Sequence, residues 1–66
     1  MRGKVKWFSN AKGYGFITDD EKGRDVYVHF TDIKMNGFKS LNENQEVNFE
    51  LTTTPKGLAA KEVFVT

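Results

Sequence analysis

Residues 12–17 read Lys-Gly-Tyr-Gly-Phe-Ile and place two aromatic side chains two positions apart, separated by a glycine. In an extended strand, side chains alternate between the two faces, so Tyr14 and Phe16 share one face while Gly15 and Ile17 share the other. The face with the rings then has no bulky side chain between them. Because rings can stack on bases and lysines can contact phosphates, this pattern predicts a surface for a flat, anionic polymer.

The segment from Val26 to Phe30 has a similar arrangement. By alternation Val26, Val28 and Phe30 fall on one face, and Tyr27 and His29 fall on the other. A strand of a small barrel cannot bury both of its faces, so the valine face is expected in the core and the other face toward solvent. The two segments therefore predict neighbouring strands that display aromatic rings on one surface.

Four blocks of the sequence resemble the bacterial cold-shock domain family. The segments 12–17 and 26–30 resemble its two ribonucleoprotein motifs. The triplets 6–8 (Lys-Trp-Phe) and 37–39 (Gly-Phe-Lys) match the same family in order and spacing, and the similarity extends over residues 3–65. The resemblance implies an all-β fold, a five-stranded antiparallel Greek-key barrel of the OB type. It also implies binding of single-stranded RNA and DNA by an RNA chaperone of low sequence specificity.

The resemblance also implies which residues contact nucleic acid. It places Phe30 on the ring-bearing surface, although alternation alone would bury it, and we follow the resemblance. His29 has neither a second histidine nor a cysteine to complete a metal or catalytic site, so it is interpreted as a stacking ring. Asp25 is expected to accept a hydrogen bond from a base. The predicted nucleic-acid-binding residues are Lys6, Trp7, Phe8, Lys12, Tyr14, Phe16, Asp25, Tyr27, His29, Phe30, Phe38, Lys39 and Lys56.

Three departures from the family pattern limit the assignment of the family's binding residues to this sequence. Ser9 stands where asparagine is common, Asp32 where a small apolar residue is common, and Leu58-Ala59 replace Pro-Gln. The side chain of Ala59 cannot hydrogen-bond to a base edge as glutamine can. Part of the base preference is therefore expected to be lost.

Alternation and turn residues predict strands over residues 4–8, 14–18, 25–30, 45–52 and 58–65. The adjacent Trp7 and Phe8 interrupt the first alternation, so either one of them enters the core or a bulge re-aims it, and Trp7 is expected to be partly exposed. Ile33 is expected to plug one end of the barrel. Residues 34–44 are expected to form an exposed crossing loop that displays Phe38.

The chain has 66 residues, so we predict one domain over residues 1–66, with marginal stability because so short a chain buries only about 60% of its unfolded surface. The absence of cysteine excludes disulfides and thiolate zinc sites. No apolar run approaches the ~20 residues of a membrane helix, and the N-terminal residues lead into an alternating strand instead of a signal sequence. A cytoplasmic monomer without cofactor or metal is expected.

The formal charge of +1 does not by itself indicate a nucleic-acid partner. Lys4, Lys6 and Lys12 surround the first aromatic block, whereas acids cluster at 19–21 in a predicted turn. This distribution fits a basic stripe, to which Lys34, Lys39 and Lys56 can be added. Charges scattered for solubility remain the alternative interpretation.

Two other classes of function are weighed against nucleic-acid binding. A barrel that docks a peptide could use the same aromatic residues. An enzyme is not predicted, because one histidine and no cysteine leave only carboxylates, and none has a spacing that pairs it with another in a site. The predicted partners are single-stranded RNA and DNA, with pyrimidine-rich strands preferred, and neither a membrane nor a small-molecule substrate.

Overall fold

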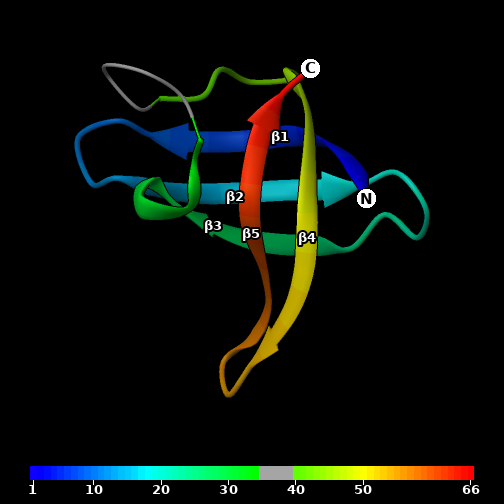
Figure 1. The fold of residues 1–66 in the computed structure, drawn as a ribbon. Coiled ribbons are helices and arrows are strands. Elements are labelled where there is room, and N and C mark those ends of the chain that lie inside the picture. The colour runs from blue at the N-terminus through cyan, green and yellow to red at the C-terminus, as the bar shows by residue number, and fades with distance from the viewer. Residues whose placement is uncertain (35–39) are drawn as a thin grey trace.

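The computed structural model describes residues 1–34 and 40–66, and Figure 1 shows their arrangement. In these residues the chain forms five strands and a short 3-10 helix: β1 (Arg2–Ser9), β2 (Tyr14–Asp19), β3 (Asp25–His29), η1 (Phe30–Asp32), β4 (Glu46–Thr54) and β5 (Gly57–Val65). The strands close into a barrel in the order β1-β2-β3-β5-β4. This confirms the predicted all-β, five-stranded barrel. No helix in the described part of the chain has the length and hydropathy of a membrane span.

The first three strands form an antiparallel meander, and the long β4–β5 hairpin runs across it in Figure 1. β1 pairs with β4 in antiparallel orientation, whereas β3 pairs with β5 in parallel orientation, through Tyr27 and Ala59. The parallel pair has a geometric cause, because a closed ring with an odd number of strands cannot alternate direction throughout. The closing contact thereby places the start of β5 beside the middle of β3.

The barrel interior is filled by the residues that alternation selected, since Ile17, Val26 and Val28 are fully buried. Ile33 is also fully buried and forms a bridge to Val63, which agrees with its predicted place at one end of the barrel. Within the described residues, the core cluster consists of Val5, Ile17, Val26, Val28, Ile33, Leu41, Val47, Phe49, Ala60 and Val63. Burial of these aliphatic side chains is the main favourable contribution to folding.

The loop after η1 differs from its prediction. Residues 34–44 were expected to be exposed, but Leu41 is buried in the core, only 3% exposed. A leucine flanked by polar residues carries no periodic signal, so its burial is decided by the tertiary fold. Phe38 and Lys39 lie outside the described residues.

A β-bulge in β1 resolves the interrupted alternation. Val5 pairs with Ile17 and Trp7 pairs with Phe16, so Lys6 is an extra residue without its own partner. One added residue reverses the facing of all that follow, and Lys6 and Trp7 are therefore both exposed. Gly15 permits this bulge, because a Cβ atom there would overlap the carbonyl oxygen of Trp7.

Candidate functional site

Four aromatic side chains from three adjacent strands form one cluster on the outside of the barrel, which we call the ring surface: Trp7, Tyr14, Phe16 and Tyr27. The ring centroids of Trp7 lie 5.8 Å from Tyr14 and 5.6 Å from Phe16. Tyr27 lies 5.9 Å from both Tyr14 and Phe16. These tilted and edge-on contacts are geometries that aromatic pairs prefer. Each ring therefore packs against two of the others, and these contacts stabilise the arrangement of the cluster.

The strand register explains the ring surface. Trp7 is opposite Phe16, and Phe16 is opposite Tyr27, so a row of three rings crosses β1, β2 and β3. Trp7 and Tyr27 are 37% and 36% exposed, and Phe16 between them is half-buried. All lie outside the core cluster, on the outer face that alternation predicted.

Phe30 extends this surface beyond the end of β3. The strand ends at His29, so the side chain of Phe30 is released from strand alternation and is 42% exposed, as the family resemblance implied. Its N–H donates a hydrogen bond to the carbonyl of Gly13 (2.8 Å), and its ring lies over Gly13, where a Cβ atom would be 2.7 Å from Cδ1 of Phe30. Gly13 also has a φ of +79°, a conformation that favours glycine. Glycine is therefore required below this ring.

His29 is held in place by the helix that follows it. Its Nδ1 accepts a hydrogen bond from the N–H of Thr31 (3.4 Å) and lies 3.0 Å from the hydroxyl of Thr31. The ring centroids of His29 and Phe30 are 4.7 Å apart at 39°. The half-buried imidazole thus forms a second, smaller ring pair next to the ring surface.

Phe8 is separated from these rings. It is half-buried and packs against the core, and Cδ1 of its ring lies 3.0 Å from where a Cβ atom of Gly15 would stand. Because Trp7 points outward, its strand neighbour points inward. The structure therefore gives no support to the prediction that Phe8 contacts nucleic acid.

The charges near the rings are partly paired. Lys6 forms an ion pair with Asp25 (3.2 Å), and both side chains are about half-exposed. Lys12 and Lys56 are exposed, and neither forms an ion pair with another described residue. Lys34, a possible member of the basic stripe, instead lies 3.8 Å from Glu62. Among the described lysines of the predicted site, Lys12 and Lys56 are therefore available to an anion.

The acids at 19–21 are not all in a solvated turn, because Asp19 ends β2 and is buried, 1% exposed. Its carboxylate accepts hydrogen bonds from the N–H of Lys22 (2.6 Å), the N–H of Arg24 (3.2 Å) and Nε of Arg24 (2.8 Å). The Lys22 hydrogen bond, followed by those of Arg24, lowers the pKa of Asp19 to about 2. Asp19 therefore fixes the β2–β3 turn.

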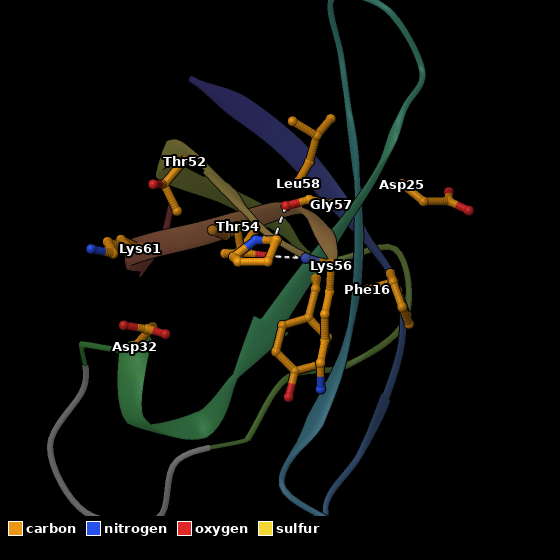
Figure 2. A pocket seen from close by; sticks show the side chains of 13 residues that line it. Phe16, Asp25, Asp32, Thr52, Thr54, Lys56, Gly57, Leu58 and Lys61 are labelled. Atoms are coloured by element: carbon orange, nitrogen blue, oxygen red, sulfur yellow. Dashed lines mark hydrogen bonds between the residues drawn. The ribbon is translucent and has the colours of Figure 1, made fainter.

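An open hollow of about 800 Å³ adjoins the ring surface where β3, η1 and the β4–β5 hairpin meet. Phe16 and Asp25 lie at one end in Figure 2, and Asp32 and Lys61 at the other. The hollow is lined by Phe16, Asp25, Tyr27, Asp32, Thr52, Thr54, Pro55, Lys56, Gly57, Leu58, Ala59, Ala60 and Lys61. Sequence reasoning missed this feature, since its lining comes from segments that only the barrel closure brings together.

Two of the residues that depart from the family pattern, Ser9 and Ala59, lie near the ring surface or in the turn beside it. Ser9 Oγ accepts a hydrogen bond from the N–H of Lys12 (3.2 Å) and so caps the β1–β2 turn. Ala59 is the register partner of Tyr27 and lines the hollow, next to the ring surface.

Among the described residues, no group of three or more histidine or carboxylate side chains is placed to hold a metal ion.

Comparison with known proteins connects this geometry to one family. A family model described as the "'Cold-shock' DNA-binding domain" matches residues 1–66. The chain is 58% identical to a cold shock-like protein of Thermotoga maritima, over 98% of this chain and 97% of that protein. It is 56% identical to a cold shock-like protein of Aquifex aeolicus (98% and 93%) and 51% identical to cold shock-like protein CspE of Escherichia coli (96% and 91%).

The fold is also similar to a solved structure, Drosophila Unr CSD456. The TM-score is 0.80 at 22% identity, over 98% of this chain and 26% of that chain. At this identity the match concerns the fold alone.

Proposed function

Because the chain belongs to the cold-shock DNA-binding domain family, we propose that it binds single-stranded RNA and DNA by base stacking and acts as an RNA chaperone. The observation that carries the proposal is the ring surface, in which four aromatic side chains contact one another outside the core. Large aromatic groups gathered on the surface of a small domain are typical of binding sites.

Stacking explains why the strand must be unpaired. A base exposes its faces to a side chain only when it has left the duplex stack, and every base has such a face. The ring pair of His29 and Phe30 lengthens the surface beyond Tyr27. We therefore propose a strand that crosses from Trp7 toward Phe30, bound with low sequence specificity and with pyrimidine-rich strands preferred.

The charged residues complete the proposed interface. Lys12 is exposed on the β1–β2 turn that leads into Tyr14, and Lys56 is exposed on the β4–β5 turn and lines the hollow beside Tyr27, so both can contact phosphates. Asp25 is proposed to accept a hydrogen bond from a base and to release Lys6 when it does so. Ala59 offers no side-chain hydrogen bond beside Tyr27, which reduces discrimination among bases. The interface needs no cofactor and performs no catalysis.

Chaperone activity follows from binding by mass action. A protein that binds the melted state of an RNA hairpin, but not its folded state, stabilises the melted state by about 2.7 kcal/mol when its free concentration is one hundred times Kd. Weak RNA hairpins would open at such concentrations, and stable ones would not. We propose that this occurs in the cytoplasm, with the single domain of residues 1–66 acting as a monomer.

A hairpin RNA with a fluorophore and a quencher at its ends tests the proposal. Addition of the protein should increase fluorescence as the stem opens, and Phe16→Ala and Tyr27→Ala should each require more protein for the same opening. Phe64→Ala is the matched control, because Phe64 is an aromatic residue 50% exposed on β5, opposite Asn48 and outside the ring surface. If all three variants open the hairpin equally well, the ring surface is not the interface, and docking of a peptide becomes the better hypothesis.

A further inference from the structure

The hollow beside the ring surface contains an acidic group that the proposed function does not use. Asp32 lines it from the end of η1, together with Thr52 of β4 and Lys61 of β5. We propose that this hollow binds one guanine of the single strand and that Asp32 selects it. The inference rests on the proposed function and adds a base-specific site to a surface of low specificity.

The two carboxylates that line the hollow differ in their contacts. Asp25 is held by the ammonium of Lys6, at 3.3 and 3.2 Å from its two oxygens. In the described part of the chain, no hydrogen bond or ion pair engages the carboxylate of Asp32, although the residue is half-buried. Among the described residues, both oxygens of Asp32 are therefore available as acceptors.

A carboxylate with two available oxygens favours one base. An ionised aspartate only accepts hydrogen bonds, and the Watson–Crick edge of guanine presents two adjacent donors, N1–H and the N2 amine. Adenine and cytosine place an acceptor beside their amine donor, and uracil and thymine place carbonyl acceptors on both sides of N3–H. Each of these would set a lone pair against the carboxylate. Asp32 thus discriminates by attraction to guanine and repulsion of the other bases.

The remaining lining suits a nucleotide. Leu58, Ala59 and Pro55 give the hollow an apolar wall for the base, and its volume of about 800 Å³ falls within the range of small-molecule sites. Because position 59 is an alanine, no long side chain extends from it into the space beside Tyr27. The site is continuous with the ring surface, so a strand stacked there can place a neighbouring base in the hollow.

Two lysines lie at the hollow, where phosphates would flank the base. Lys56 is on the hairpin turn and Lys61 is at the end shared with Asp32 (Figure 2). The turn is fixed by Thr54, whose Oγ1 accepts a hydrogen bond from the N–H of Lys56 (3.2 Å) and donates one to the carbonyl of Gly57 (2.9 Å). Lys56 therefore extends from an ordered position.

Titration of seven-residue RNA strands tests the inference. The strands are oligo-U and a set in which a single guanine replaces each uracil in turn, with binding followed by Trp7 fluorescence. At one position guanine should raise the affinity of the wild-type protein over oligo-U, and Asp32→Asn should reduce that guanine-to-uracil ratio by roughly 5- to 150-fold, the range of a bidentate base contact.

Control variants distinguish the selection of guanine by Asp32 from the general effect of removing a negative charge. Removal of any acid raises affinity for every strand, so the ratio is the readout and not the affinity itself. Asp20→Asn, which removes an exposed acid from the β2–β3 turn, should leave the ratio unchanged. Asp32→Ala should reduce the ratio as Asp32→Asn does.

Free guanosine monophosphate should not displace oligo-U, because it lacks the stacked neighbours, and displacement would contradict a strand-bound guanine.

Failure of the guanine site can be distinguished from failure of the proposed function. If the wild-type protein binds oligo-U but the guanine-to-uracil ratio is the same in wild type and Asp32→Asn at every position, the guanine site is wrong while the proposed function stands. If the wild-type protein binds neither oligo-U nor the guanine-containing strands, the proposed function fails, and this inference fails with it.

Discussion

The ammonium of Lys6 lies between the two carboxylate oxygens of Asp25, at 3.3 and 3.2 Å, on the outer face of the barrel beside Trp7. An exposed ion pair of this kind contributes little to stability, typically 0–1 kcal/mol. Its consequence is functional, since a lysine that is already paired cannot neutralise a phosphate without leaving its partner.

Asp25→Asn should release Lys6 and steepen the salt dependence of binding to oligo-dT. Each additional phosphate neutralised on a single strand changes the slope of log K against log salt concentration by about 0.7. Titrations at several salt concentrations measure this slope. The matched control is the double variant Lys6→Gln with Asp25→Asn, in which no lysine is released. A slope that is the same in wild type and Asp25→Asn would show that the pair does not compete with phosphate.

Removal of a ring should weaken binding of nucleic acid, whereas removal of a core side chain should weaken the stability of the fold. Phe16→Ala and Tyr27→Ala should each weaken binding by about 1 to 3 kcal/mol per stacked base, with little change in the free energy of unfolding. Val28→Ala should destabilise the fold by about 1 to 3 kcal/mol, because Val28 is fully buried. Thermal melts and titrations of all three variants measure both quantities. Unfolding of Tyr27→Ala at ordinary temperature would mean that Tyr27 belongs to the core.

Gly15→Ala should displace the bulge that exposes Trp7. The new Cβ atom would overlap the Trp7 carbonyl and lie 2.6 Å from Cα of Phe8, so the strands must separate. We expect a loss of about 1 to 3 kcal/mol in unfolding free energy, as for overpacking, together with a shift in tryptophan emission. Gly23→Ala is the control: its φ is +68° but nothing lies within 4 Å, so it should lose stability without the emission shift. An unchanged emission in Gly15→Ala would contradict the proposed role of Gly15.

Asp19 should make stability depend on acid pH. Its pKa is about 2 in the folded protein and 3.8 ordinarily, so the carboxylate stabilises the fold above about pH 4, and this contribution is lost as the pH falls toward 2. Asp19→Asn should be less stable than wild type at pH 7, and the difference should shrink between pH 4 and pH 2. Urea unfolding of both proteins at these pH values measures it, with Asp20→Asn as a control that stays near wild type. A constant difference between wild type and Asp19→Asn would rule out this role.

The meander was predictable from sequence because its strands lie in the sequence order and alternate clearly. Ile17, Val26 and Val28 were assigned to the core, and Tyr27 to the surface, from alternation alone, and the structure agrees. Alternation failed at Phe30, because β3 ends at His29 and a helical residue no longer follows a period of two. There the family resemblance supplied the placement.

Features that depend on the closed barrel could not be predicted. The hollow unites Asp32 with residues of the β4–β5 hairpin that lie 20 or more positions later in the chain. The burial of Leu41 and the hydrogen bonds of Asp19 likewise depend on tertiary packing and turn geometry. Asp32 and Ala59 were visible only as departures from a family pattern, which indicated where to look but not what the positions form.

The fluorescence of Trp7 tests the central claim most directly, because Trp7 is the single tryptophan and belongs to the ring surface. Titration with oligo-dT of six or more nucleotides should quench its emission in a saturable manner, and a duplex of equal length should not, since its bases are already stacked. Quenching by oligo-dT should weaken in Phe16→Ala and persist in Phe64→Ala. Equal quenching by single-stranded and duplex DNA, or none by either, would contradict base stacking on the ring surface.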